Sequence, residues 1–348
     1  MTLPLEGVRI LTVEQYGAGP FGTMWLADQG AEVIKIEAPE GGDYARALGP
    51  YWFDNGDSQW FHAYNRNKKS LTLDLRSDEG RRVFLDILKT ADVVVSNLRG
   101  DVPEKLGLTY EHLKEANPKI VCAHLSAYGR DGPRASWPGF DYLMQAETGW
   151  FSLTGEPDQP PTRFGLSLVD QMTGVALAYA ALCGIIRARA SGEGGDVDVS
   201  LFDVALSNLG YPAIWYLNAG HVQERLARSA HPHLTPCQLY KTADGWIFLM
   251  CNKEKFWPVL AQALGHAEWA NDPRFKTFKE RFECRPLIQD MLDEALSAKT
   301  TAEWLADFAG AVPAAPINDV REALENPFVK DEGRLQDIEL EGHGTYRT

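Results

Sequence analysis

The sequence predicts an α/β fold, with a doubly wound, Rossmann-like parallel sheet in a large first domain and a smaller α+β domain after it. Three observations predict this. The chain opens with a β-α-β pattern over residues 8–37, strands and helices alternate to about residue 130, and the pattern changes after about residue 225. A β-α-β opening implies parallel strands, because the helix returns the chain to the end of the sheet from which it started.

Each element of the first domain is predicted from a local pattern. Apolar, β-branched runs predict strands at residues 8–13, 31–37, 70–75, 92–96, 119–125 and 196–201. Helices are predicted from the glycine-rich turn at residue 17 to residue 29, and over 77–90, 109–116 and 168–190. Gly30 is expected to end the first helix, and residues 191–195 are expected to form a turn.

The second domain is predicted from a hairpin and three amphipathic helices. Alternating strands at 237–240 and 246–250 are joined by Asp244-Gly245, and the helices are expected at 254–264, 284–298 and 301–309. The predicted organisation is a large domain at 1–205, a linker at 206–224 and a small α+β domain at 225–329, with 330–348 as a candidate C-terminal return to the large domain.

The composition is that of an ordinary globular protein and argues against some classes. The 348 residues carry a formal net charge of −14, which argues against a nucleic-acid binder, because the phosphate backbone favours a clustered positive surface. The five cysteines are widely spaced, which favours free thiols over a disulfide framework or a zinc site. No secretory signal and no uninterrupted apolar run of about 20 residues is visible, so we expect a cytoplasmic protein without a membrane segment.

A glycine pattern near the N-terminus is ambiguous. Gly17-x-Gly19-x-x-Gly22 follows a strand, opens a helix and precedes Glu37 at the end of the next strand, which satisfies the dinucleotide-binding fingerprint. Glycines let a phosphate approach the backbone at the positive end of a helix. The same glycines could simply turn the chain. The segment therefore indicates a phosphate-bearing ligand without identifying it, and a dinucleotide-dependent oxidoreductase stays open.

A longer ordered set of motifs is more specific. The set consists of Gly17-Ala18-Gly19-Pro20, residues 26–37, Gly42-Asp43 with Arg46, residues 65–75, residues 96–99, residues 129–133, Gly139-Phe140-Asp141, and Asp170 ahead of Gly174. From about residue 5 to 330 the chain resembles the class III CoA-transferases, the family of formyl-CoA and carnitine CoA-transferases that also contains the α-methylacyl-CoA racemases.

This resemblance implies an assembly and a nucleophile. It implies a two-domain subunit whose large domain binds CoA, and a dimer of two subunits interlocked like rings. The family's nucleophilic aspartate falls on Asp170. A carboxylate that attacks a thioester gives a mixed anhydride, the CoA thiolate then forms an enzyme-bound thioester, and the incoming acid reverses the sequence. CoA is therefore a substrate, and no tightly bound cofactor is expected. From the residues alone, a helix cap is the better interpretation of Asp170.

The resemblance also implies the contacts to CoA. They fall on Gly17, Ala18, Leu73, Arg76, Asn97, Leu98, Arg99 and Lys105, and Asp141 lies in the loop that neighbours the catalytic aspartate. Basic side chains suit the phosphates of CoA. The other interpretation of Arg76 and Lys105 is that they are ordinary solvated surface charges.

Several family positions differ in this chain. Gly17 and Ala38 stand where formyl-CoA transferases have glutamine and arginine, so Arg46 or Arg66 are candidates for some nucleotide contacts. Residues 231–237 occupy the place of a glycine-run loop, which argues against oxalate and formate as substrates. The Pro-x-Gly-x-His stretch that usually closes the family is missing, as expected of an abbreviated C-terminal return or of a fragment.

Racemisation is the nearest alternative reaction. Racemases carry a His-Asp pair where this chain has Phe140-Asp141, and proton transfer at an α-carbon needs an acid/base group on each face. Phe140 cannot supply a proton, and His124 is interpreted as a buried strand residue. The sequence therefore favours CoA transfer.

Other classes are less favoured. Asp170 counts against a non-catalytic CoA-binding protein. A metal site is not expected, because His231 and His233 are the only close histidine pair and no carboxylate cluster accompanies them. Basic residues near the candidate site loops (Arg130, Arg163 and His231) favour short dicarboxylic acids as the exchanged substrates.

Overall fold

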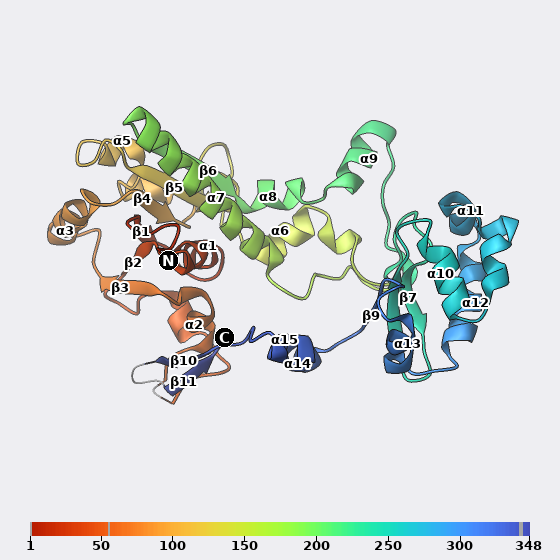
Figure 1. Ribbon diagram of the computed structural model, residues 1–348. Coiled ribbons are helices and arrows are strands. Elements are labelled where there is room, and N and C mark those ends of the chain that lie inside the picture. The colour runs from red at the N-terminus through yellow and green to blue at the C-terminus, as the bar shows by residue number, and fades with distance from the viewer. Residues whose placement is uncertain (1, 55, 341–343) are drawn as a thin grey trace. The chain divides into compact units, whose positions relative to one another are not determined.

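The computed structural model describes residues 2–54, 56–340 and 344–348, and its contacts divide the chain into two compact units (Figure 1). The large unit comprises Met1–Phe151, Arg163–Asn218 and Asp337–Thr348, and the small unit comprises Ser152–Thr162 and Ala219–Gln336. Each unit therefore contains segments that are distant in sequence.

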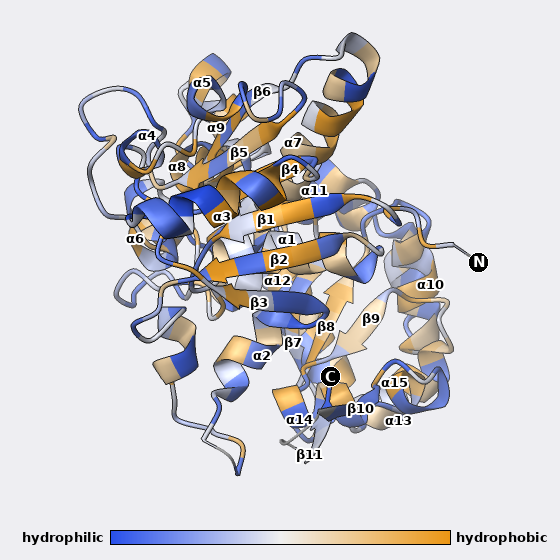
Figure 2. Cartoon of the chain, turned by 90° about the vertical axis from the view of Figure 1, so that its left-hand side faces the viewer, coloured by the Kyte–Doolittle hydropathy of each residue, from blue (hydrophilic) through white to orange (hydrophobic). Residues whose placement is uncertain are grey.

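The large unit is built on a six-stranded parallel sheet in the order β3-β2-β1-β4-β5-β6. Its strands are β1 (Arg9–Val13), β2 (Glu32–Glu37), β3 (Lys68–Thr72), β4 (Val93–Ser96), β5 (Val121–Ser126) and β6 (Gly195–Ser200). The order reverses between β1 and β4, as in doubly wound folds. The central β4 and β5 are entirely buried, whereas the edge strand β3 is largely hydrophilic (Figure 2). The predicted α/β class is confirmed.

Two apolar cores cover opposite faces of this sheet. On one face, α1 (Ala18–Asp28) and α7 (Leu168–Ser191) pack over side chains such as Ile10 and Val95. On the other face, α3 (Asp78–Leu88) and the short α5 (Tyr110–Leu113) cover residues such as Leu11 and Val94; the short α4 (Val102–Lys105) precedes α5 in the chain. Adjacent strand residues point to opposite faces, so one strand supplies both cores.

The remaining elements of the large unit are short. They are η1 (Tyr44–Ala47), α2 (Gln59–Asn65), α6 (Asp141–Glu147), η2 (Trp150–Ser152), α8 (Leu201–Ser207), α9 (Tyr211–Ala219), and the antiparallel pair β10 (Asp337–Leu340) and β11 (Gly344–Arg347). α9 lies across the boundary between the units. The Tyr346 ring packs 5.8 Å from that of Phe53, within the large unit.

The small unit has a three-stranded antiparallel sheet in the order β7-β8-β9. Its elements are β7 (Cys237–Lys241), β8 (Trp246–Met250), β9 (Ala314–Pro316), α10 (Phe256–Ala263), α11 (Phe278–Glu283), α12 (Arg285–Leu296), α13 (Thr301–Phe308), α14 (Val320–Glu325), α15 (Pro327–Asp331) and the short η3 (Ala227–Ser229), η4 (Ala267–Asn271) and η5 (Pro273–Phe275). Tyr240, Ile247, Trp257 and Leu292 belong to its apolar core. The hairpin and three helices predicted here are present.

Two predicted elements differ from the structure. The strand expected at 70–75 is β3, displaced toward the N-terminus, because its parallel pairing with β2 ends where Thr72 lies opposite Glu37. The helix expected at 109–116 is the single turn α5, since the Leu113 carbonyl accepts from the amides of both Ala116 and Asn117 and closes the turn. Short elements such as α2, α6, α9 and β9 were not predicted, because they are too short for a periodic pattern.

α7 is a core helix of the large unit. By length and composition alone it could cross a membrane, although the sequence shows no uninterrupted apolar run of that length. Buried residues extend along it from Val169 to Ala188, and many of them belong to the core that covers the sheet. Gly192, with φ of 79°, ends it, as the glycine turn predicted.

α1 and α7 approach each other at the level of their backbones. A Cβ atom added at Gly22 would lie 2.2 Å from the Gly174 carbonyl oxygen, and one added at Gly174 would lie 2.4 Å from the Ala18 carbonyl oxygen. Neither distance is physically possible for a side chain. The crossing therefore requires glycine on both helices, and it brings the start of α1 next to the start of α7.

This crossing predicts a large effect of a single methyl group. Gly22→Ala should destabilise the large unit by about 2–3 kcal/mol or more, because the helices must separate to admit the Cβ. Thermal unfolding monitored by circular dichroism would measure the loss. Gly245→Ala is the matched control, since an added Cβ there meets no atom within 4 Å. Equal melting temperatures for the two variants would contradict the helix crossing.

Candidate active site

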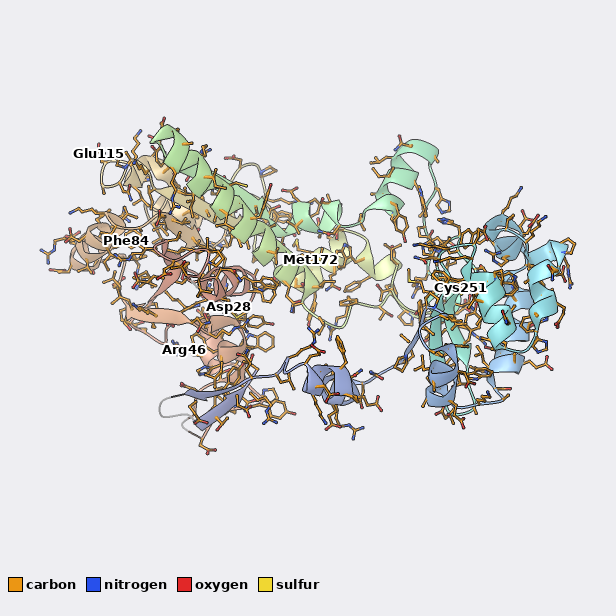
Figure 3. All side chains as sticks on the ribbon, viewed as in Figure 1. Asp28, Arg46, Phe84, Glu115, Met172 and Cys251 are labelled. Carbon is orange, nitrogen blue, oxygen red and sulfur yellow. The ribbon has the colours of Figure 1, made fainter. Side chains whose placement is uncertain are left out.

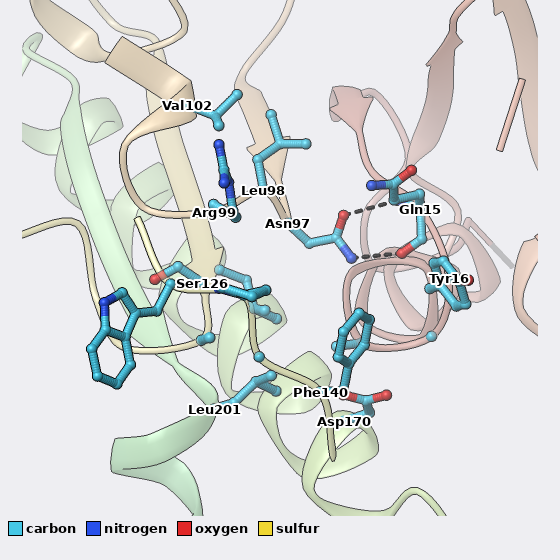
Figure 4. A pocket seen from close by; sticks show the side chains of 17 residues that line it. Gln15, Tyr16, Asn97, Leu98, Arg99, Val102, Ser126, Phe140, Asp170 and Leu201 are labelled. Atoms are coloured by element: carbon cyan, nitrogen blue, oxygen red, sulfur yellow. Dashed lines mark hydrogen bonds between the residues drawn. The ribbon is translucent and has the colours of Figure 1, made fainter. Parts of the chain in front are cut away.

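A pocket of about 380 Å³ opens at the carboxyl ends of β1, β4 and β5 (Figure 4). It is lined by Gln15, Tyr16, Gly17, Ala18, Asn97, Leu98, Arg99, Val102, Leu125, Ser126, Ala127, Trp137, Pro138, Gly139, Phe140, Asp170 and Leu201. These residues follow strands on both sides of the point where the strand order reverses. Open α/β sheets bind ligands at this position, because the loops diverge there and leave a crevice.

Asp170 supplies a carboxylate to the wall of this pocket. It is the third residue of α7 and is partly buried. Among the described residues, no group donates a hydrogen bond to its side chain. Burial, together with the nearby Asp141 carboxylate, raises the pKa of Asp170 to about 7. A carboxylate of this basicity is a stronger nucleophile than an ordinary aspartate and is still substantially ionised near neutral pH.

Asp141, not Asp170, caps α7. The Asp141 carboxylate is buried and accepts a hydrogen bond from the Asp170 backbone amide at 2.9 Å. Its other oxygen accepts from the Gln145 side chain at 2.6 Å. Burial raises the pKa of Asp141, although these hydrogen bonds oppose that effect. From the residues alone, Asp170 is interpreted as a helix cap. In the structure the Asp141 carboxylate caps α7 instead.

The three glycines of the N-terminal pattern each make room for a different neighbour. A Cβ at Gly17 would lie 3.2 Å from Asp170 Oδ2, one at Gly19 would lie 2.8 Å from the Asn97 Cβ, and one at Gly22 would meet the Gly174 carbonyl. None of the three has a positive φ. The spacing is therefore explained by packing around Asp170, Asn97 and α7, and it does not require a dinucleotide.

The comparisons with known proteins identify the family. A family model described as CoA-transferase family III matches residues 5–348. The chain belongs to this family. A succinate–glutarate CoA-transferase of Agrobacterium fabrum is 36% identical, over 97% of this chain and 86% of that protein. An acetyl-CoA:oxalate CoA-transferase of Acetobacter aceti is 34% identical, over 93% of this chain and 83% of its own length.

Solved structures agree with these relatives. A CAIB/BAIF family protein from Brucella suis superposes with a TM-score of 0.84 at 33% identity, covering 99% of this chain and 95% of its own. A protein from Mycobacterium tuberculosis superposes with a TM-score of 0.87 at 30% identity, with coverages of 99% and 92%. The chain is a CoA-transferase, and its substrates are therefore CoA thioesters and carboxylic acids.

The structure brings six of the predicted site residues of the transferase together. Gly17, Ala18, Asn97, Leu98, Arg99 and Asp170 all line the pocket. Asn97 also has a structural task, because its side-chain amide donates to the Gln15 carbonyl at 2.7 Å and accepts from the Gln15 amide at 2.8 Å (Figure 4). This two-way clamp joins the loops that follow β1 and β4.

The other four predicted residues do not line the pocket of the transferase. Leu73 packs against the core beneath α3, and Asp141 caps α7. Arg76 and Lys105 are exposed and pair with Asp74 and Asp101. Their interpretation as surface charges is therefore compatible with the structure, and their contact with CoA stays a prediction.

The two arginines considered for nucleotide contacts are engaged elsewhere. Arg46 pairs with Glu37 at 2.7 Å, and Arg66 pairs with Asp28 at 2.6 Å; Arg46 and Asp28 are labelled in Figure 3. Neither arginine lines the pocket. They stabilise the large unit of the transferase around β2 and the end of α1.

Histidines are absent from the described lining of the pocket. His124 is buried on β5, where its ring nitrogens lie 2.9 Å from Ser96 Oγ and 3.0 Å from Asp196 Oδ1. Its interpretation as a buried strand residue is confirmed. Phe140, which cannot supply a proton, lines the pocket, and this favours transfer over racemisation.

Tyr16 and Trp137 line the pocket, and the sequence analysis did not single them out. Tyr16 has a φ of 65°, a strained conformation for a tyrosine, and its ring packs 6.4 Å from that of Phe140. Trp137 packs against Tyr128 and lies under the Arg134 guanidinium. No local sequence signal marks either residue, because only the fold brings residues 16 and 137 to one pocket.

The raised pKa of Asp170 predicts a pH-dependent cost to stability. The folded pKa, about 7, lies above the value of an unfolded aspartate, so ionisation of Asp170 destabilises the folded state progressively as pH rises from about 4 to 7. Asp170→Asn should therefore be more stable than wild type by about 2–4 kcal/mol at pH 8 and by almost nothing near pH 4. Melting temperatures at both pH values would test this, and a pH-independent difference would contradict it.

Proposed function

We propose that the enzyme transfers CoA between carboxylic acids through covalent intermediates on Asp170. The observation that carries this proposal is the partly buried Asp170 carboxylate, which accepts no hydrogen bond from the described residues and forms part of the pocket at the carboxyl ends of the parallel strands. A carboxylate held for structural reasons would have hydrogen-bond donors around it, as Asp141 does.

The first half of the reaction loads CoA onto the enzyme. An Asp170 oxygen attacks the thioester carbonyl of the donor, the C–S bond breaks, and CoA leaves as the thiolate. This gives a mixed anhydride between Asp170 and the acyl group. The thiolate then attacks the Asp170 carbonyl carbon, which releases the donor acid as a carboxylate and leaves an aspartyl-CoA thioester.

The second half unloads CoA onto the acceptor. The acceptor carboxylate attacks the aspartyl thioester, which expels the thiolate and forms a second anhydride. The thiolate attacks the acyl carbonyl of that anhydride, which yields the new acyl-CoA and regenerates the Asp170 carboxylate. Each step exchanges one activated acyl bond for another, so the reaction needs no ATP.

The proposed CoA contacts divide into two groups. Gly17, Ala18, Asn97, Leu98 and Arg99 border the pocket, which is too small for all of CoA. The exposed Arg76 and Lys105, with Leu73 and Asp141, complete the proposed set; the basic pair would meet phosphates over the surface. No tightly bound cofactor is part of this mechanism.

Short dicarboxylic acids are the proposed exchange partners. Relatives of the chain are named for succinate, glutarate and D-citramalate. Of the three basic residues considered for this task, Arg130 is occupied by Asp196 and Asp198 on β6, and His231 belongs to the small unit. Arg163 lies over the Tyr142 ring beside Asp141 and is the remaining candidate in the large unit.

The nucleophile can be tested directly. With succinyl-CoA and glutarate, Asp170→Asn should lower transfer by about 1000-fold or more, because the amide cannot form the anhydride, while CoA binding measured by calorimetry is retained. Hydroxylamine added with succinyl-CoA should convert Asp170 of the wild type to a hydroxamate, detected by peptide mass spectrometry. A hydroxamate on another residue would refute the assignment, and α-proton exchange with solvent deuterium in the absence of transfer would favour racemisation.

We also propose that the enzyme is a homodimer, as its family resemblance implies. Val175, Tyr179 and Ile186 form an apolar stripe along α7 and are 45%, 70% and 69% exposed. Such a stripe on a helix is expected to be covered by another chain.

The exposed stripe gives a test of the dimer. The double variant Tyr179→Asp and Ile186→Asp should sediment as a monomer, because burying two carboxylates in an apolar interface is costly. Arg82→Asp on the exposed surface of α3 is the control and should leave the mass unchanged. A wild-type protein that is monomeric in light scattering would contradict the proposal.

A further inference from the structure

Beside the turn that lines the pocket lies a buried ionic network that the mechanism does not use. Three carboxylates, Glu14, Glu37 and Asp43, pair with three cations, Lys68, Arg46 and Lys35. The side chains of Lys35, Asp43, Lys68 and Glu14 are each at most 2% exposed. Burying unpaired charges is costly, so these pairs must be formed in the folded protein. Asp43 of the Gly42-Asp43 motif, Arg46 and Lys68 take part in these ion pairs. The catalytic chemistry does not explain why the sequence carries the motifs to which they belong.

The network holds the turn between β1 and α1 at three points. Before the turn, Glu14 accepts hydrogen bonds from Lys68 at 2.9 Å and from the Thr23 hydroxyl at 2.7 Å. After the turn, Lys68 also donates to the Pro20 carbonyl at 2.8 Å. In its middle, the Tyr16 amide donates to Asp43 Oδ1 at 3.0 Å.

Asp43 is the centre of this arrangement. One of its oxygens accepts from the amides of Tyr16 and Ala45, and the other accepts from Lys35 at 2.6 Å. Lys35 lies on β2 and is held in turn by the Asn65 side chain at 3.1 Å. Asp43 therefore connects β2, through Lys35, to Tyr16, the residue of the turn whose φ of 65° is strained.

The position of this turn determines how closely Asp170 is covered. Gly17 follows Tyr16 directly, and a Cβ added to it would lie 3.2 Å from Asp170 Oδ2, closer than ordinary van der Waals contact. Tyr16 and Phe140 lie with Asp170 on the same side of the pocket (Figure 4). If the turn moved outward, the carboxylate and any intermediate attached to it would be more exposed to water.

We propose that Asp43, fixed by Lys35, is a positioning residue for CoA transfer that holds the Tyr16–Gly17 turn against Asp170 and keeps water from the acyl-enzyme intermediates. This inference rests on the proposed Asp170 intermediates. When the turn is loose, water adds to the anhydride or thioester carbonyl, releases the free acid or CoA thiol, and regenerates the Asp170 carboxylate. The acyl-CoA is then hydrolysed instead of exchanged.

Two double variants separate positioning from stability. Lys35→Met with Asp43→Leu removes both charges and the acceptor for the Tyr16 amide. Lys35→Met with Asp43→Asn also removes both charges but keeps an oxygen that can accept from Tyr16. Arg9→Met with Glu32→Gln is the control, because this ion pair joins β1 to β2 at the end of these strands that lies away from the Tyr16–Gly17 turn.

The readout is the ratio of hydrolysis to transfer with succinyl-CoA and glutarate, measured as free CoA thiol against glutaryl-CoA. The Lys35→Met, Asp43→Leu variant (the Leu variant) should raise this ratio about tenfold and lower kcat about tenfold, with little change in KM. The Lys35→Met, Asp43→Asn variant (the Asn variant) should keep the ratio and kcat within about threefold of wild type. The Arg9→Met, Glu32→Gln control should match wild type. Equal ratios in the Leu and Asn variants would overturn the proposal.

Two further measurements deal with hydrolysis that does not pass through Asp170 and with a Leu variant that does not fold. Adding Asp170→Ala to the Leu variant should abolish the extra hydrolysis; hydrolysis that persists would count against the Asp170 intermediates themselves and not against the role of Asp43. If the Leu variant does not fold, hydrogen exchange on wild type decides the matter. The Tyr16 amide should exchange as slowly as the amides of β1, and exchange at the rate of an open loop would overturn the proposal.

Discussion

The contact between α1 and α7 is the constraint on which the site depends. Gly22 and Gly174 let the two helix backbones meet, and the starts of both helices consequently lie side by side. One start carries the Gly17 turn and the other carries Asp170. Since a Cβ at either glycine would meet a carbonyl oxygen at an impossible distance, the distance between turn and carboxylate follows from helix packing. The core of the large unit thus brings the turn and Asp170 together, and the loops after the strands supply most of the other lining of the pocket.

The environment of Asp170 combines two opposing demands. Covalent chemistry favours a basic, poorly solvated carboxylate, whereas folding favours a solvated or hydrogen-bonded one. The protein separates these tasks between two acids on different helices: Asp141 satisfies the helix terminus and takes the hydrogen bonds, and Asp170 is left without them. The resulting rise in the pKa of Asp170 is a local cost in stability, which the apolar cores on both faces of the sheet offset.

The turn after β1 is held from both sides by residues far away in the sequence. Asn97 clamps Gln15 from the β4 side, while Asp43 and Lys68 hold Tyr16 and Pro20 from the β2 and β3 side. This explains why a pattern typical of dinucleotide-binding proteins occurs in a CoA-transferase. The glycines allow close packing where this turn meets Asn97, Asp170 and α7, and phosphate binding is one use of such a turn among several.

The sequence by itself determined the α/β class, most strands of the parallel sheet, the long helix from residue 168, the hairpin at 237–250 and the position of Asp170 at a helix start. These features follow from periodicity, turn residues and ordered motifs, all of which are local. Only the tertiary structure decided that Asp141 caps α7, that Gly17, Gly19 and Gly22 each fit a different neighbour, and that Leu73, Arg76 and Lys105 lie outside the pocket. The physical reason is that such roles depend on contacts between residues tens of positions apart, and a local pattern carries no information about which distant side chain will fill the adjacent space.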